Sequence, residues 1–155
     1  MAHTSEYFPD GTPISEWFYD TSVPTLAEMG APYSITEYGA LDDGRIHTRE
    51  IQAAIDTAAQ NGGGVVIVPP GTYLSGALYF KQGVNLYVER GATLKGSDNL
   101  VDYDLTETRC EGETCLYYSA LINADGLDGF TISGPGTIDG NGLRSWQAFW
   151  MRRRW

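Results

Sequence analysis

The sequence has few cysteines, few histidines and few basic residues, and it lacks a long apolar run. Its 155 residues include 2 cysteines, 2 histidines and 10 lysines and arginines against 20 acidic residues, giving a formal net charge of −10. Two cysteines without a nearby histidine cannot complete a tetrahedral zinc shell, so we expect no metal site and no cofactor. The acidic balance argues against nucleic acid or an anionic membrane surface as a partner. No stretch of about 18 apolar residues occurs, so we expect no membrane span.

The cysteines and the N-terminus leave the compartment of the protein open. Cys110 and Cys115 flank four residues, and a disulfide between them would close a very short loop and add modest stability. Two free thiols fit this spacing equally well. The first residues lack the basic start and the apolar run of a signal peptide. Either the protein stays inside the cell, or a leader is missing from this sequence.

Three short segments repeat a glycine, a β-branched or small residue and an apolar residue. They are Gly71–Gly76, Gly91–Gly96 and Gly136–Gly140. The first two start 20 residues apart, and the third starts 45 residues after the second. A period near 20 residues is typical of a solenoid whose coils consist of short strands.

The apolar pattern predicts one helix and a series of short strands. Thr48 to Gln60 carries one apolar stripe, with Thr48 as the expected N-cap and the run Asn61 to Gly64 as the stop signal. Tyr33 to Tyr38 alternates and should form a strand that ends at Gly39. Further strands are expected at 65–68, 72–74, 77–80, 84–88, 92–94, 120–124, 130–133 and 137–138. Because hairpin dipeptides between these runs are almost absent, parallel stacking fits better than an antiparallel sandwich.

The pattern divides the chain into a leader and a repetitive body. Residues 1–32 are rich in proline and aromatic residues, and we interpret them as an extended leader that packs its aromatic side chains on the outside of the body. Residues 33–155 hold the predicted helix and coils, and the helix is expected to cap the open end of the first coil. Residues 98–119 break the period and form a polar, acidic insertion. An insertion of this size on one face of a solenoid is more often functional than structural.

A series of motifs follows in a characteristic order. They are Ile35–Ala40, Asp43-Gly44, Gly62–Gly64, Val68-Pro69, Gly71–Tyr73, Leu94–Ser97, Thr108-Arg109, Glu111-Gly112, Tyr118-Ser119 and Ile132–Gly142. In this order they resemble the N-terminal portion of glycoside hydrolase family 28, which contains the polygalacturonases and rhamnogalacturonases. The resemblance implies an all-β fold: a right-handed, single-stranded parallel β-helix of the pectin lyase-like kind, truncated, with one N-terminal capping α-helix.

The resemblance also implies a function in the degradation of plant cell walls. It suggests a fragment of a polygalacturonase-type, inverting hydrolase that cleaves α-linked galacturonic acid residues. The partner would be pectin, as homogalacturonan or rhamnogalacturonan, and members of the family are expected to be secreted or periplasmic. The alternative is a structural or carbohydrate-binding β-helix module without catalysis.

The catalytic motifs of the family do not occur in this sequence. Members carry Asn-Thr/Ser-Asp, an Asp-Asp pair within the coils, Gly-His-Gly and Arg-Ile-Lys. The pair Asp42-Asp43 precedes the predicted helix and is interpreted as a solvated loop. We therefore assign no catalytic residue and expect this chain alone to be inactive. An uncapped last coil would also leave an open strand edge, which predicts self-association.

The candidate substrate-binding residues are Arg109, Glu111, Trp146 and Trp150. Arg109 and Glu111 lie in the insertion and could line a substrate groove, with an exposed ion pair of the loop as the favoured alternative. Trp146 and Trp150 resemble a Trp-rich segment of bacterial members of the family. They could stack on sugar rings or pack as one helix face, and their spacing favours packing. The basic cluster Arg152–Arg154 is interpreted as a solvated helix end or loop.

Overall fold

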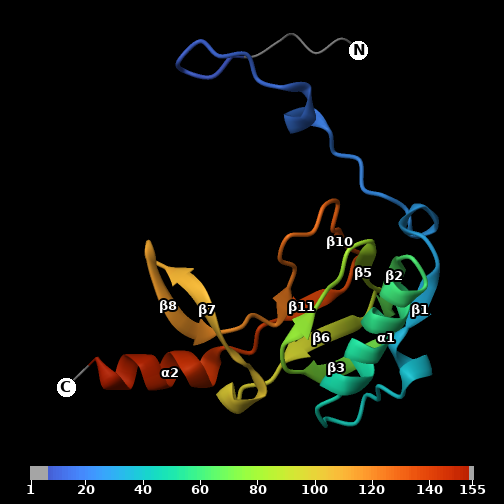
Figure 1. Cartoon of the computed structure of the whole chain (residues 1–155), viewed down its shortest axis with the longest axis vertical. Helices are drawn as coiled ribbons and strands as arrows, with labels where there is room; N and C mark the ends of the chain where they lie inside the picture. Colours follow the sequence, from blue (N-terminus) through green and yellow to red (C-terminus); the bar gives the residue numbers. More distant parts are fainter. Residues whose placement is uncertain (1–6, 154–155) are drawn as a thin grey trace.

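The computed structural model describes residues 7–153, and most of its strands lie in parallel sheets (Figure 1). Eight strands build the coils: β2 (Gly64–Val68), β3 (Gly71–Ser75), β4 (Leu78–Tyr79), β5 (Val84–Val88), β6 (Ala92–Gly96), β9 (Ile122–Asn123), β10 (Ile132–Ser133) and β11 (Thr137–Asp139). The sequence predicted a strand at each of these places.

The chain visits three sheets in the same order in the first two coils, and the third coil contributes to the first two of these sheets. In the first sheet β2, β5 and β10 are neighbours, in the second β3, β6 and β11, and in the third β4 and β9. All these pairs are parallel. Such an arrangement is a parallel β-helix, which confirms the predicted parallel stacking. The repeat of about 20 residues appears in the register, because Gly71 pairs with Ala92 and Ser75 pairs with Gly96.

The core consists of apolar side chains that stack from one coil to the next. Val66 lies opposite Leu86 in the register of β2 and β5, and Tyr73 lies opposite Leu94 in that of β3 and β6. These four side chains are at most 3% exposed. Because alternate residues of a strand point to opposite faces, one face of each strand supplies this core.

Helix α1 (Thr48–Gln60) confirms the predicted bounds and packs its apolar stripe into the core. The buried residues of the stripe are Ile51, Ala54, Ile55 and Ala58. The expected N-cap was wrong: His47 holds that position, and it makes no side-chain cap. The Thr48 hydroxyl instead accepts a hydrogen bond from the Gly76 amide at 2.7 Å. This bond joins the helix to the turn after β3. The stop at Asn61 and Gly62 is confirmed.

The predicted strand from Tyr33 to Tyr38 is only half correct. The structure has a short strand, β1 (Pro32–Ser34), which pairs with β2, followed by a 3₁₀-helix, η3 (Ile35–Tyr38). Ile35 is fully buried and Tyr38 is half-buried. This spacing of three residues satisfies the period of a 3₁₀-helix, in which side chains at i and i+3 lie on one side.

The leader contains two 3₁₀-helices, η1 (Glu16–Tyr19) and η2 (Leu26–Met29). We expected its aromatic residues to pack on the body, and this expectation was wrong for Trp17 and Phe18. Their rings stack on each other with centroids 3.9 Å apart and remain 67% and 52% exposed. Figure 1 shows the segment leading away from the coils. The leader contacts the body nearer its end, where the Met29 side chain is buried.

The insertion forms a regular hairpin, which the sequence analysis treated as a loop. After the 3₁₀-helix η4 (Leu100–Asp102), strand β7 (Leu105–Cys110) pairs antiparallel with β8 (Glu113–Tyr118). Glu111 and Gly112 connect them with φ angles of 51° and 93°. Positive φ at both central residues is the signature of a type I′ turn. Both cysteines lie on this hairpin and are free thiols.

A second helix, α2 (Leu143–Arg152), follows β11, and it has no buried residue. Figure 1 shows this helix, in red, beside the hairpin and projecting from the coils. The basic cluster begins at its end, as predicted, although Arg154 lies outside the described residues.

Candidate functional site

At one corner of the β-helix, two segments leave the coils: the insertion and α2. These segments are called the excursions below. The insertion leaves the second sheet after β6, and α2 leaves the same sheet one coil later, after β11. Since β6 and β11 are paired neighbours, the hairpin and the helix arise side by side. In the first coil the same corner is a tight turn around Gly76, which leads directly from β3 to β4. All four predicted substrate-binding residues lie on the two segments that leave the coils here, Arg109 and Glu111 at the tip of the hairpin and Trp146 and Trp150 on α2.

Hydrogen bonds fix the base of the insertion to the coils. The Ser97 hydroxyl donates to the Asp102 carboxylate, and the Tyr103 hydroxyl donates to the Ser97 carbonyl oxygen at 3.0 Å. Glycine is required beneath this base. A Cβ atom at Gly76 would collide with the carbonyl oxygen of Asp102, and one at Gly96 would lie 2.8 Å from the Tyr103 hydroxyl. The last glycine of the repeated motif therefore makes room for the insertion.

Arg109 and Glu111 lie at the exposed tip of the hairpin. The Arg109 side chain donates from Nε to the Gly112 carbonyl oxygen at 3.1 Å, which ties it to the turn. Among the ion pairs of residues 7–153, neither side chain has a partner, so the favoured alternative of a loop ion pair was wrong. The positive charge of Arg109 is thus held in place and remains available to a ligand.

Trp146 and Trp150 lie one turn apart on α2, as their spacing predicted. They were expected to pack against a neighbour, but they remain 60% and 55% exposed. Both line a hollow of about 570 Å³ together with Leu143, Gln147 and Met151. Phe149 lies edge-to-face against both indole rings, and the Arg153 guanidinium lies 4.6 Å from its ring centre. The helix therefore presents an aromatic and basic surface without a partner.

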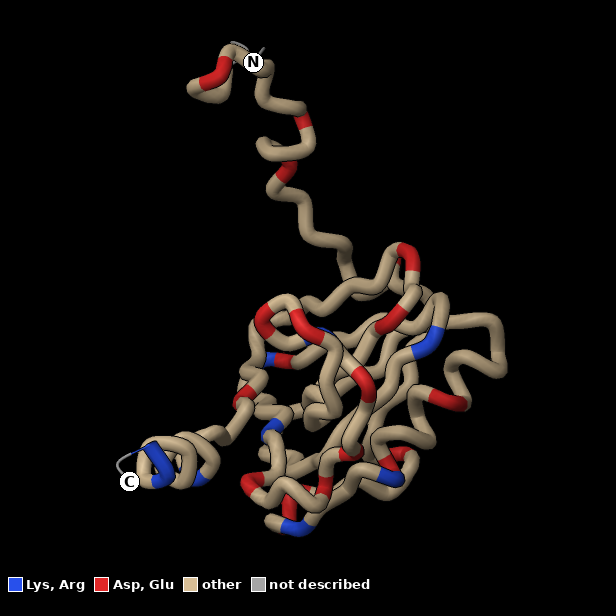
Figure 2. Tube along the Cα trace, turned by 60° about the vertical axis from the view of Figure 1, so that its left-hand side comes forward, with Lys and Arg blue, Asp and Glu red and all other residues tan. Residues whose placement is uncertain are grey.

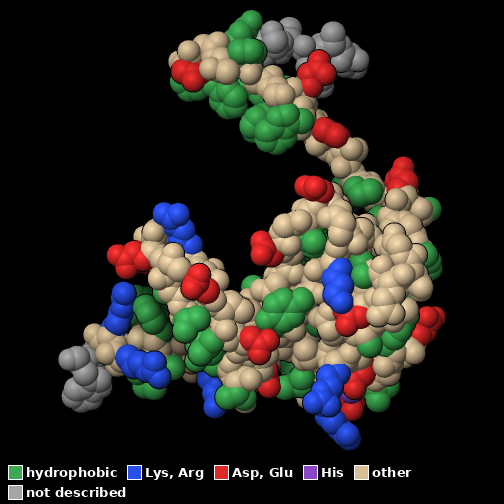
Figure 3. Space-filling model, viewed as in Figure 1, with side chains coloured by type: hydrophobic (Ala, Val, Ile, Leu, Met, Phe, Trp, Pro, Cys, Tyr) green, Lys and Arg blue, Asp and Glu red, His purple; other side chains and the backbone are tan. Residues whose placement is uncertain are grey.

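Lysine and arginine side chains lie on α2 and at its junction with the coils. Figure 2 shows lysine and arginine positions on α2 and acidic positions spread over the rest of the chain. Arg144 lies 3.6 Å from Asp98, and Lys95 lies 3.9 Å from Asp139, so the cations at the junction with the coils are paired with carboxylates. Figure 3 shows hydrophobic side chains exposed near the hairpin and α2.

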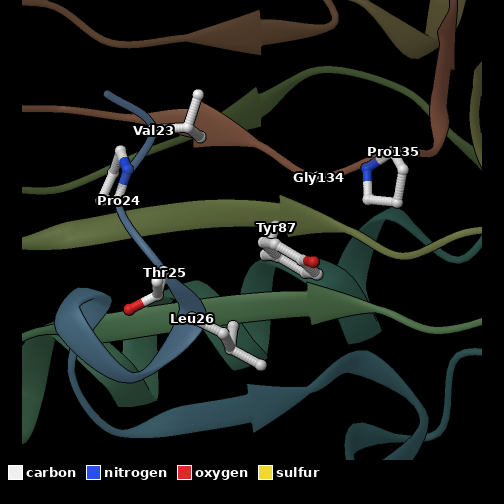
Figure 4. Close-up of a pocket in the computed structure, with 7 residues that line it drawn as sticks. All are labelled: Val23, Pro24, Thr25, Leu26, Tyr87, Gly134 and Pro135. Atoms are coloured by element: carbon white, nitrogen blue, oxygen red, sulfur yellow. The ribbon is translucent and has the colours of Figure 1, made fainter. Parts of the chain in front are cut away.

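A second hollow of about 500 Å³ lies between the leader and the coils (Figure 4). Tyr87 of β5 points into it, and the residues around Tyr87 are Val23, Pro24, Thr25, Leu26, Gly134 and Pro135. No charged side chain lines it. The sequence analysis missed this hollow because its walls come from three distant segments. Its walls hold no cation that could pair with the carboxylate of a charged sugar.

The sequence analysis also missed a cavity without charged walls at the base of the corner. Tyr103, Ser119 and Asn141 line it beside the first turn of α2. The motif Tyr118-Ser119 and the repeat ending at Gly140 marked these segments, but no pattern placed them together. In the part of the chain that the structure describes, no group of three or more acidic, histidine or cysteine side chains could hold a metal ion.

The fold is that of a parallel β-helix protein, and comparisons with known proteins agree with it. The exo-poly-α-D-galacturonosidase of Dickeya chrysanthemi is 33% identical over 146 residues, which are 88% of this chain and 24% of that protein. The endo-polygalacturonase of Pectobacterium carotovorum subsp. carotovorum is 33% identical over 126 residues, or 76% of this chain and 30% of that protein. No family model matches the sequence.

Solved structures show the same relationship. The family 28 exopolygalacturonase of Yersinia enterocolitica superposes with a TM-score of 0.66 at 36% identity, over 72% of this chain and 21% of that one. The exopolygalacturonase of Thermotoga maritima also gives 0.66, at 30% identity, over 77% and 26%. The chain is therefore a relative of the family 28 glycoside hydrolases, which confirms the resemblance. It spans about a quarter to a third of the length of the curated relatives named above.

Proposed function

We propose that the chain supplies the first coils and a substrate-binding corner of a pectin-degrading glycoside hydrolase of the polygalacturonase type. The substrate would be α-linked galacturonic acid in homogalacturonan or rhamnogalacturonan, hydrolysed with inversion. The observation that carries this proposal is the identity of 33% with an exo-poly-α-D-galacturonosidase over 88% of the chain. A secreted or periplasmic location would follow, since pectin lies outside the cell.

The corner supports the proposal through its chemistry. Arg109 is anchored to the hairpin turn and can pair with a sugar carboxylate, for which a guanidinium fork is well suited. Trp146 and Trp150 offer exposed aromatic faces on which sugar rings can lie. Glu111, beside Arg109, would accept hydrogen bonds from sugar hydroxyl groups. These four residues would bind and orient the polymer.

Catalysis would come from further coils of a longer protein. An inverting glycosidase needs a general acid and a general base whose carboxyl groups stand about 6.5–9.5 Å apart, so that a water molecule fits between base and sugar. On a parallel β-helix, side chains of neighbouring coils provide such separations, since strands repeat about every 4.8 Å. The sequence contains no Gly-His-Gly, which supports a location of the catalytic groups beyond these coils.

The two ends of the coils would have different roles. Helix α1 would cap the first coil, because its buried stripe joins the core beside η3 and β2. At the other end, β10 and β11 expose Ile132 and Ile138 by 45% and 41%. A next right-handed coil would cover both side chains and continue both sheets. A truncated protein that ends here would leave this edge open.

The second candidate function is a β-helix module that binds a partner without catalysis. It is supported by a relative with a binding function in its name, the plasmin and fibronectin-binding protein A of Streptococcus pneumoniae. That protein is 34% identical over 119 residues, which are 70% of this chain and 15% of its own length. Sequencing the gene beyond Trp155 separates the two candidates. Asn-Thr-Asp and Gly-His-Gly motifs in further coils would support the hydrolase, and their absence would support the module.

The proposed function is tested by binding and by turnover on the same polymer. Electrophoresis of the 155-residue chain through gels that contain polygalacturonate should show retardation, and gels with neutral galactan should not. A reducing-end assay with the same chain should show no product, since the catalytic groups are assigned to other coils. Absence of retardation would contradict the substrate-binding role. Measurable turnover would contradict the location of catalysis.

A further inference from the structure

The tip of the hairpin carries both cysteines on one face. In the register of β7 and β8, Cys110 lies opposite Glu113, and Cys115 lies opposite Thr108. Residues that lie opposite each other share a face, and so do residues two positions apart in one strand. Cys110 and Cys115 are therefore diagonal neighbours on one face of the hairpin.

The burial of the two side chains indicates that they cover each other. Within β8, which the structure describes completely, Cys115 is the one residue that is not exposed. Cys110 is half-buried, although the three residues before it in β7 are exposed. A hydrogen bond to Cys115 is the main cause that raises the pKa of the Cys110 thiol. The reduced hairpin thus already brings the two thiol groups together.

Few other interactions hold the tip of the hairpin. Among the hydrogen bonds of residues 7–153, the one side-chain bond within 107–116 runs from Arg109 to the Gly112 carbonyl oxygen. The bonds of Ser97 and Tyr103 fix only the base of the insertion. A two-stranded hairpin by itself is marginally stable in water. A covalent link between the strands would therefore have a large effect on the order of the tip.

The spacing of the two cysteines favours a link that opens readily. Diagonal neighbours on paired strands stand about 7–8 Å apart. The Cα atoms of a disulfide usually stand about 4.4–6.8 Å apart. The tip must therefore tighten to close the bond. Strained or exposed disulfides have more oxidising potentials, and they are reduced more easily than structural ones.

We propose that Cys110 and Cys115 form a reversible intrachain disulfide, which closes the tip of the hairpin under oxidising conditions and opens under reducing ones. The oxidant is itself a disulfide, such as oxidised glutathione. One cysteine thiolate attacks the oxidant and displaces a thiolate, and the other cysteine thiolate attacks the mixed disulfide and displaces the second. The two electrons pass to the oxidant, whose sulfurs leave as thiols with the two protons of the cysteines. This inference does not depend on the proposed function.

The test uses the 155-residue chain in glutathione buffers of different redox ratio. Oxidised buffer should yield a monomer that has lost the mass of two hydrogen atoms and takes up no thiol-alkylating reagent. Excess reduced glutathione should restore alkylation of both cysteines in the folded protein. Protease cleavage after Glu111 and Glu113 separates the cysteines, so the oxidised fragments should stay joined until they are reduced.

Four results would overturn the proposal. They are free thiols in the most oxidising buffer, a disulfide between two chains, a mixed disulfide with glutathione that persists, and a bond that resists excess reduced glutathione. The first three would show that the two sulfur atoms do not meet within one chain. The fourth would show a permanent link instead of a reversible one.

A matched variant separates the placement of the thiols from their number. Thr114 lies opposite Arg109, on the other face of the hairpin. The double variant Cys115→Ser, Thr114→Cys keeps two thiols at the tip but directs them to opposite faces. It should form at least about tenfold less intrachain disulfide in the same buffer, because side chains that point apart cannot be bridged without movement of the backbone. An equal amount of disulfide in this variant would contradict the assigned pair.

The order of the tip has a readout of its own. Trypsin cleavage after Arg109 requires local opening of the hairpin, so it should be at least about tenfold slower in the oxidised protein. Cleavage after the exposed Arg152 of α2 serves as an internal control and should not change. Cys110→Ser should be cleaved after Arg109 at the same rate in both buffers. An equal rate in oxidised and reduced wild type would show that the bond does not close the tip.

Discussion

The first two coils and the third coil follow the same register but differ in burial. Leu86 in the second coil is fully buried, whereas its register partner Ile132 in the third coil is 45% exposed. The same contrast separates Leu94, fully buried, from Ile138, which is 41% exposed. A strand of a β-helix gains its burial from the coils on both of its sides. The third coil has a neighbour on one side only among the described residues, so an identical pattern of apolar residues stabilises it less.

The two regions also differ in their chemistry. The first coil has a tight turn at the corner where the second and third coils carry the insertion and α2. The third coil continues into α2, whose aromatic face remains exposed. We expect the first two coils to be the more stable part of the molecule, and the candidate binding residues lie on the segments that leave the second and third coils. Sites that bind ligands are commonly found in the less stable parts of a protein.

The largest expected difference concerns core truncation in the second and third coils. Leu86→Ala should lower the free energy of unfolding by about 2–5 kcal/mol, as is usual for a large buried side chain. Ile132→Ala, its register partner, should cost less than about 1 kcal/mol, since the side chain is half-exposed. Urea denaturation followed by circular dichroism measures both. Similar losses of the free energy of unfolding for the two variants would contradict the difference in burial between the second and third coils.

A second comparison uses two glycines that end the repeated motif. Gly76→Ala in the first coil should cost about 1–3 kcal/mol, because the new Cβ collides with the backbone of Asp102. Gly140→Ala in the third coil should change stability by less than about 0.5 kcal/mol, since a Cβ there meets no atom within 4 Å. Thermal melts of both variants measure the difference. A neutral Gly76→Ala would contradict the tight seating of the insertion.

The open edge of the third coil should cause association. β10 and β11 present apolar side chains and unpaired backbone groups, which is the usual template for edge-to-edge pairing. Sedimentation velocity should show a sedimentation coefficient that rises with protein concentration. Ile138→Lys should abolish this rise, and Leu143→Lys on α2 serves as a control for a general effect of charge. A concentration-independent monomer for the wild type would contradict the open edge.

The smallest expected effect is a dependence of stability on pH in the first coil. The hydrogen bond from His47 at 2.8 Å is the main cause that lowers the pKa of Asp43 in the folded state. A lowered pKa contributes stability that is present above the unfolded value, and this stability is lost as the pH falls through the folded value. As the pH is lowered below about 4, where unfolded carboxyl groups titrate, the melting temperature should therefore decrease.

Asp43→Asn should flatten part of that acid decline. Asp42→Asn removes the same charge from the neighbouring residue, which has no bond to His47, and it serves as the control. Melting curves between pH 6 and pH 2.5 compare the three proteins. An Asp43→Asn variant that declines as steeply as wild type would show that this bond does not contribute.

Much of the fold could be predicted because the spacing of the repeated motif indicates which strands lie next to each other. The period of about 20 residues placed β3 and β6 side by side, and the stripe of α1 predicted both its bounds and its buried face. Local ambiguities accounted for the errors. Thr48 has the side chain of an N-cap, but its hydroxyl bonds to Gly76, which no local pattern reveals. Tyr33 and Ile35 alternate as in a strand, whereas Ile35 and Tyr38 have the spacing of a 3₁₀-helix, so the segment carried both signals.

The site could be predicted only in part. Arg109 and Trp146 were predicted because their residue types suit an acidic sugar, and their role remains a prediction; the structure places them on the two segments that leave the coils after β6 and β11. The cavity beside Ser119 could not be found from the sequence. Its walls come from segments that lie more than 40 residues apart between Ser97 and Ser145, and they meet only because two coils carry excursions at the same turn. The Glu111-Gly112 turn was a usable signal for the hairpin.

Amide hydrogen exchange resolved by residue tests the contrast between the coils most directly. Strands β2 and β5 each have a paired strand on either side, so their amides should exchange only through global unfolding and show the highest protection. The amides of β10 and β11 should exchange at least about tenfold faster, through opening of the third coil alone. Equal protection in all three coils would contradict the account, because the third coil would then be as firmly held as the first two.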